Sequence, residues 1–197
     1  MLECISDFLK EQAQKWWMGT HQNKMYCIKR SVIYKCKKWI LNCNFLVWTA
    51  ALGKVLTTDN LRKRRLMLLD WCCMCKANGE SIDHLFLHCS IARDLWSLVF
   101  SIFGVWWVMP CHFLELLTCW SSGFKSYRSA HLWELIPHCV LWVIWPERNA
   151  RFFEDGERTA QGLKQFFLNS LFDWVNASGN YHFTSLYELI NFCQFSL

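Results

Sequence analysis

The chain has 197 residues, of which 53% are hydrophobic and 19% are charged. This composition excludes a disordered tail and is sufficient for one packed core. The net charge of +5 is uneven: residues 1–65 hold 13 Lys/Arg and 4 Asp/Glu (+9), whereas residues 66–197 hold 8 and 12 (−4). A basic surplus at one end of the chain indicates a surface that meets an anionic partner.

The N-terminal half is expected to begin with an amphipathic helix over Ile5–Trp17 and a basic connector over residues 18–38. A second helix follows and ends at Gly53, with Leu41, Phe45, Trp48 and Leu52 as its apolar stripe. Thr58 is placed to cap a short third helix. The apolar run Leu66–Trp71 is either a strand or an extended entry to the cysteines that follow.

The C-terminal half predicts a half-buried helix over 92–103 and further helices near residues 111–120, 130–145, 159–175 and 184–193. Thr159 and Thr184 are the expected caps of the last two. Residues 132–145 are apolar almost all round, so this helix should be central and buried, and kinked or ended near Pro137 and Pro146.

Two features bear on the compartment. Twelve cysteines are too few for a disulfide scaffold of this length, and the N-terminus lacks the pattern of a secretory signal. We therefore expect an intracellular protein, cytoplasmic or nuclear, with reduced thiols. The segment Leu95–Leu114 has 20 residues without Lys, Arg, Asp or Glu, but Gly104 and Pro110 interrupt it, so we do not expect a membrane partner.

Residues 72–89 concentrate metal-binding side chains. Cys72, Cys75, His84 and Cys89 give the spacing C-x2-C-x8-H-x4-C. Two thiolates on a tight turn and a second pair on the next element complete a tetrahedral shell, and sulfur with imidazole favours zinc. The closed shell predicts a structural Zn2+ with no small-molecule substrate. The alternative is that these cysteines simply fill a core.

Two ligand assignments have competitors. Cys73 can replace Cys72, although a C-x-C pair makes a poorer chelating turn. His88 can replace Cys89, because His84 and His88 share one face of an unbroken helix. Cys89 requires the backbone to leave the helix after Leu87, and Ser90 is a suitable cap for a new helix. We therefore predict a mainly α fold, a helical domain with a small zinc knuckle of the Cys-Cys-His-Cys type inserted between helices.

Several motifs resemble the zinc-binding domain that follows the reverse transcriptase of LINE-type (non-LTR) retrotransposons. They are the run Trp48–Arg64, the Cys72/Cys75 pair, Glu80-Ser81 before His84-Leu85-Phe86, Cys89, and Ala92 followed by Trp96. Downstream, Trp142, Trp145 and Glu147–Phe153 resemble the helix that usually follows in that family. The resemblance covers about residues 45–175. It divides the chain into a basic N-terminal segment (1–40), the zinc-binding domain (41–110) and a helical extension that packs on it (111–197).

Two departures from that family affect the interpretation. The entry segment at residues 34–44 lacks the usual proline, and residue 146 is Pro where Lys or Arg is usual, so the long helix should bend there. The chain also contains no Asp-Asp dyad of the polymerase type, so it lacks the carboxylate cage for two-metal nucleotidyl transfer. The resemblance thus implies a zinc-binding part without enzymatic activity.

Arg62, Lys63, Arg64 and Arg65 are the candidate nucleic-acid contacts. Four cations on one short helix beside a rigid knuckle can follow a phosphate backbone of RNA or DNA. The other interpretation is a solvated helix end whose cations suit the helix dipole. Two functions are therefore expected: a zinc module with residual RNA or DNA binding, or a structural or protein-interaction remnant without a nucleic-acid role.

Overall fold

The computed structural model describes residues 38–123, 129–154 and 156–194. Within these ranges there are helices and no strands. The α-helices are α2 (Lys38–Ala51), α3 (Thr58–Lys63), α4 (Ser90–Phe103), α5 (Phe113–Gly123), α6 (Ala130–Phe153), α7 (Ala160–Ser178) and α8 (Leu186–Gln194), with the π-helix η2 (His84–His88) before α4. The predicted mainly α fold is confirmed. The helix expected over Ile5–Trp17 and most of the connector after it lie outside the described residues.

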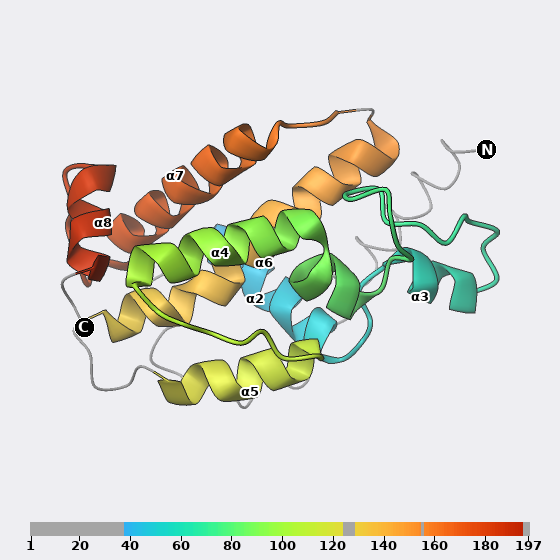
Figure 1. Cartoon of the computed structure of the whole chain (residues 1–197), viewed down its shortest axis with the longest axis horizontal. Coiled ribbons are helices and arrows are strands. Elements are labelled where there is room, and N and C mark those ends of the chain that lie inside the picture. Colours follow the sequence, from blue (N-terminus) through green and yellow to red (C-terminus); the bar gives the residue numbers. More distant parts are fainter. Residues whose placement is uncertain (1–37, 124–128, 155, 195–197) are drawn as a thin grey trace.

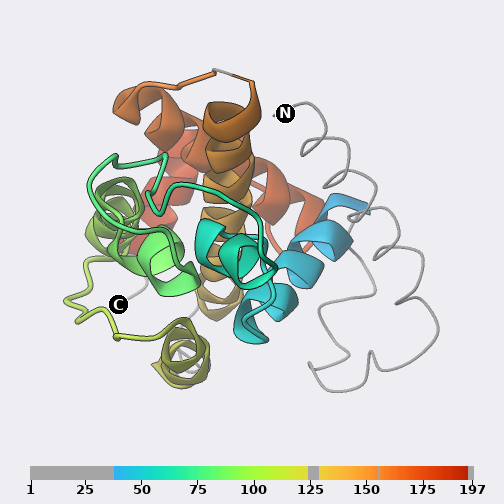
Figure 2. The same ribbon diagram turned by 90° about the vertical axis from the view of Figure 1, so that its right-hand side faces the viewer.

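Helix α6 is the centre of the fold. It contacts α2, α4, α5, α7 and η2, and the two views show these elements arranged around it (Figures 1 and 2). Its sequence is apolar on nearly every side between Leu132 and Ile144, and most of these residues are buried. Burial of each large apolar side chain contributes about 1.5–3 kcal/mol, so the surrounding helices are held mainly by this one.

The two prolines do not end α6, which runs through Pro137 and Pro146 to Phe153. A proline leaves the carbonyl four residues earlier without its helical partner. For Pro137 this is the carbonyl of Trp133, and the indole N–H of Trp120 donates to it at 2.8 Å. Of the two expected outcomes near these prolines, a kink or an end, the end does not occur, and at Pro137 a hydrogen bond from α5 replaces the missing one.

The second predicted helix, α2, is confirmed, but its expected face is not. Leu46, Val47 and Ala50 are buried, whereas Trp48 and Leu52 are exposed. Residues 45–52 are apolar on all sides except Thr49, so periodicity alone could not select the face. The helix ends as predicted at Gly53, whose φ of +68° is the left-handed conformation that glycine tolerates.

Of the two caps predicted for the last two helices, one is confirmed and one is wrong. Thr159 caps α7 as predicted, and its hydroxyl accepts from the Gly162 N–H at 3.1 Å. Helix α8 begins at Leu186, one residue later than a cap at Thr184 would require. There the Ser185 hydroxyl accepts from the Glu188 N–H at 3.3 Å, while Thr184 donates to the Glu188 carboxylate. Ser185 is thus the cap.

The long uncharged segment forms helix α4 and the irregular chain after it. Gly104, with a φ of +63°, ends α4, and residues 105–110 have no regular structure. Among the described helices, none is both long enough and apolar enough to cross a membrane.

Candidate metal centre

Four side chains from residues 72–89 meet between the helices. The ligand atoms of Cys72, Cys75, His84 and Cys89 all lie within 4.8 Å of one another. Cys72 Sγ is 4.0 Å from Cys89 Sγ, and Cys75 Sγ is 3.3 Å from His84 Nε2. A tetrahedral zinc with bonds of about 2.0–2.3 Å places its ligand atoms about 3.3–3.8 Å apart. The donor set therefore matches zinc in chemistry; the Cys75–His84 separation fits this spacing, and the Cys72–Cys89 separation is slightly wider.

The first two donors lie on a tight turn. The Lys76 N–H donates to the Cys72 carbonyl at 2.8 Å, and the Cys72 N–H donates to the Asn78 carbonyl at 2.7 Å. Lys76 has a φ of +55°, which reverses the chain after Cys75. At Gly79 a Cβ would lie 2.9 Å from Asp70 Oδ1, so a side chain there would have to displace the Asp70 carboxylate. These contacts fix both thiols on one side of the turn.

The second pair of donors is set by the π-helix η2. The Cys89 N–H donates to the His84 carbonyl, five residues earlier, at 2.6 Å. In a π-turn, residues five apart share a face, in place of the residues four apart in an α-helix. His84 and Cys89 therefore point to the same place. Cys89, with a ψ of 138°, is also the N-cap of α4, so the helix breaks at Cys89 and the cap is not Ser90.

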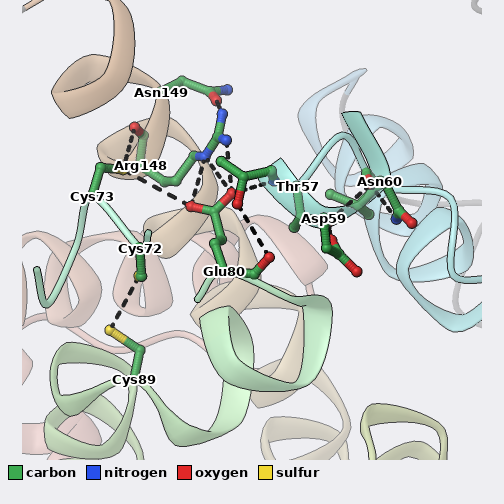
Figure 3. A network of polar contacts seen from close by, with 11 residues as sticks. Thr57, Asp59, Asn60, Cys72, Cys73, Glu80, Cys89, Arg148 and Asn149 are labelled. Carbon is green, nitrogen blue, oxygen red and sulfur yellow. Dashed lines mark hydrogen bonds and ion pairs between the residues drawn. The ribbon is translucent and has the colours of Figure 1, made fainter. Parts of the chain in front are cut away.

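The two competing residues lie elsewhere. Cys73 is buried with its Sγ 3.5 Å from the Arg148 carbonyl and 4.0 Å from Glu80 Oε2 (Figure 3). The ring Nε2 of His88 lies 2.9 Å from the Cys111 carbonyl. Neither belongs to the four-donor group. The geometry thus brings together the donors that the sequence analysis favoured.

Without a metal, the cluster retains protons. The hydrogen bond to Cys89 and burial raise the pKa of the Cys72 thiol to about 12, and the same bond lowers the pKa of Cys89. A hydrogen bond with Cys72 is the main reason why the pKa of His84 rises to about 9. At neutral pH, Cys72 and His84 are therefore protonated, and a metal ion must displace these protons to bind.

A buried ion pair lies behind the cluster and was not assigned a role from the sequence. Glu80 and Arg148 are 68 residues apart in sequence, and both side chains are fully buried. Arg148 Nη2 lies 2.7 Å from Glu80 Oε1 (Figure 3). Glu80 Oε1 also accepts from the Thr58 N–H at 2.9 Å, which satisfies the first turn of α3. Thr57 is the N-cap residue of that helix, not Thr58. The sequence shows only that Glu147 and Arg148 follow the long apolar run of this helix, and it gives no indication that Glu80 is the partner of Arg148.

The four predicted nucleic-acid contacts are all exposed at the end of α3. Arg62 and Lys63 are helical, Arg64 is the C-cap, and Arg65 has a φ of +65°. The expectation of four cations on one helix is thus wrong. Arg62 Nη1 lies 2.6 Å from Asp70 Oδ2, and Lys63 Nζ lies 3.2 Å from Asp59 Oδ2.

The chain beyond them, Leu66–Trp71, has no regular structure and is not a strand. It exposes Met67, Leu69 and Trp71. A shallow groove of about 530 Å³ is lined by Arg62, Arg65 and residues 66–69.

Part of the chain matches a model of a known protein family. No curated protein and no solved structure matches the chain significantly. The matched range is residues 12–96. It starts earlier than the resemblance described above and does not include residues 97–175, but it contains all four donors of the cluster and the basic end of α3. The model that matches these residues is the one for zinc-binding in reverse transcriptase.

Proposed function

We propose that this chain is a non-catalytic zinc-binding module derived from the reverse transcriptase of a LINE-type retrotransposon, and that it binds RNA or DNA. One observation carries the proposal: three thiols and one imidazole converge within 4.8 Å inside the region that matches a reverse transcriptase zinc-binding family. Sulfur with imidazole selects zinc over harder cations. Four protein donors fill a tetrahedral shell, so the zinc has a structural role.

The non-catalytic part of the proposal rests on two features. A closed shell holds no water or substrate on the metal. The sequence also has no Asp-Asp dyad to hold the two metal ions of nucleotidyl transfer. Zinc here stabilises the fold, since metal binding in such sites is itself folding free energy.

The exposed cations beside the knuckle support nucleic-acid binding. Arg64 and Arg65 extend the exposed basic surface of Arg62, and Trp71 is 49% exposed on the same segment, where it can stack on an unpaired base. The ion pair between Arg62 and Asp70 is exposed on both sides, so it contributes at most about 1 kcal/mol. A phosphate can displace Asp70 from this arginine.

The test uses the full chain loaded with zinc and a labelled random single-stranded RNA or DNA at about 50 and 200 mM salt. Replacing Arg62, Lys63, Arg64 and Arg65 with Gln should flatten the plot of log affinity against log salt by roughly 3 units for a single strand. Asp70→Asn, which frees Arg62, should strengthen binding. Zinc content should stay the same in both variants. Absence of any binding at the lower salt refutes the nucleic-acid part.

A second function is favoured by one observation. Met67 is 100% exposed and Leu69 is 85% exposed in the groove beside Arg62 and Arg65. Exposed aliphatic side chains do not stack on bases, and they are typical of a contact with another protein. If the chain binds zinc but no nucleic acid, a structural or protein-interaction role is the better account.

A further inference from the structure

The last turns of α6 contact the turn that carries the first two metal donors. Arg151 Nη1 donates to the Met74 carbonyl at 3.1 Å, and Met74 lies between Cys72 and Cys75. The Arg151 side chain is 6% exposed and is itself held, because its Nε is 2.9 Å from Glu147 Oε1 and its Nη1 is 2.9 Å from Glu157 Oε1. A fixed guanidinium therefore holds the backbone of the chelating turn.

A second arginine of α6 holds the segment that joins the two donor pairs. Glu80 lies between Cys75 and His84, and both of its carboxylate oxygens accept from Arg148, at 2.7 to 3.2 Å. The pair is fully buried, and the Thr58 N–H completes the partners of Glu80 Oε1. Removing such a partner from a buried carboxylate strongly destabilises the folded protein. The position of residue 80 relative to α6 is therefore tightly fixed.

We infer that Arg148 and Arg151 are positioning residues for the metal centre. Arg151 fixes the Cys72/Cys75 turn and Arg148 fixes the approach to His84, so both halves of the donor set are held against one helix before a metal arrives. This inference rests on the proposed zinc binding and extends it. Because α6 lies outside residues 12–96, the metal-binding unit is larger than the part of the chain that matches the family.

Arginine chemistry gives this inference a specific consequence. A planar guanidinium donates to two acceptors in fixed directions, whereas a lysine ammonium keeps the charge but lacks the fork. Arg148→Lys and Arg151→Lys should therefore preserve local charge and loosen the geometry. Replacing a residue that orients the metal ligands without touching the metal typically lowers metal affinity by about 10–100-fold. We expect a loss of about tenfold for each variant.

The experiment compares the zinc affinity of the full chain, by chelator competition, with that of Arg148→Lys, Arg151→Lys and a control, Arg93→Lys, on the exposed side of α4. The visible spectrum of the cobalt-substituted protein reports whether the site stays tetrahedral. The two α6 variants should bind more weakly and give altered cobalt spectra, and the control should match the wild type. Wild-type affinity and spectrum in both α6 variants overturn the inference, whereas a wild-type chain that binds no zinc overturns the proposed function itself.

A measurement on the unmodified chain covers the case in which a variant fails to fold. Hydrogen exchange is followed in the wild-type protein with and without zinc. Zinc should increase protection of residues 147–153 together with that of residues 72–89, because the two segments are joined by the arginines. Protection confined to residues 72–89 overturns the inference.

Discussion

Adjacent cysteines provide a matched pair of substitutions at the metal centre. Cys72 and Cys73 are both buried, yet Cys72 belongs to the donor group and Cys73 faces Glu80 and the Arg148 carbonyl. We predict that Cys72→Ser loses tight zinc binding and that Cys73→Ser retains one zinc per chain. The contrast separates a metal-binding thiol from a thiol that fills the core, because burial and sequence position are nearly the same.

The magnitudes follow from the contacts. Structural zinc sites contribute about 10–16 kcal/mol at neutral pH, so an even share for one of four donors is about 2.5–4 kcal/mol. At about 1.4 kcal/mol per factor of ten, Cys72→Ser should weaken binding about 100- to 1000-fold. In Cys73→Ser the hydroxyl has an acceptor in the Arg148 carbonyl, which is 3.5 Å from the present sulfur. The expected change is about 1 kcal/mol in unfolding free energy, without loss of zinc.

The assay is metal analysis of the purified chains after dialysis, followed by chelator competition for those that retain zinc. Thermal unfolding with and without chelator then reports how much of the stability depends on the metal. Equal zinc content in the two variants, or loss in Cys73→Ser alone, would refute the assignment of Cys72 as a ligand.

Three further outcomes are expected. Zinc binding at neutral pH should release protons, because the metal displaces the proton from the His84 ring, whose pKa the hydrogen bond with Cys72 raises to about 9. Zinc affinity should therefore increase as the pH rises toward 9. Calorimetry in two buffers of different ionisation enthalpy measures the proton release, and a pH-independent affinity contradicts the prediction. Gly53→Ala should lower the unfolding free energy by about 1 kcal/mol through its φ of +68° alone, since no atom lies within 4 Å of the added Cβ; equal urea midpoints would contradict this. Thr159→Ala should lower it by about 1 kcal/mol while Thr159→Ser does not, because the hydroxyl accepts from the Gly162 N–H; urea unfolding that fails to separate the two variants would disprove the cap.

Local sequence signals predicted the elements well. Apolar periodicity located α4, α5, α7 and α8 within a few residues, and Gly53 and Thr159 acted at the predicted ends because their effect depends on the local backbone alone. The spacing of cysteines and histidines likewise located the cluster. Such signals need no knowledge of the tertiary structure.

The failures occurred where a distant partner decides. Helix α6 continues to Phe153, so the end expected near residue 145 was wrong, and the Trp133 carbonyl freed by Pro137 is satisfied by Trp120 of another helix. Glu80 and Arg148 form a pair across 68 residues, which no local pattern encodes. The face of α2 was also ambiguous, because its apolar residues surround the helix and the packing of α6 selected one side.

The choice between Cys89 and His88 as the fourth donor depends on whether residues 84–88 form an α-helix or a π-helix. An α-helix through residue 88 would pair His84 with His88, and the structure forms a π-turn that pairs His84 with Cys89. The Phe86 carbonyl in this turn accepts from the Trp96 indole at 2.8 Å, which ties η2 to α4. Side-chain spacing can favour such a turn but cannot establish it, since the stabilising contact comes from ten residues away.

The most direct measurement is X-ray absorption at the zinc edge on the purified full chain, combined with its metal content. We predict one zinc per chain with three sulfur neighbours at about 2.3 Å and one nitrogen at about 2.0–2.1 Å. Absence of zinc after purification and reconstitution contradicts the account. A shell of two sulfurs and two nitrogens contradicts the assignment of Cys89 and would place His88 on the metal.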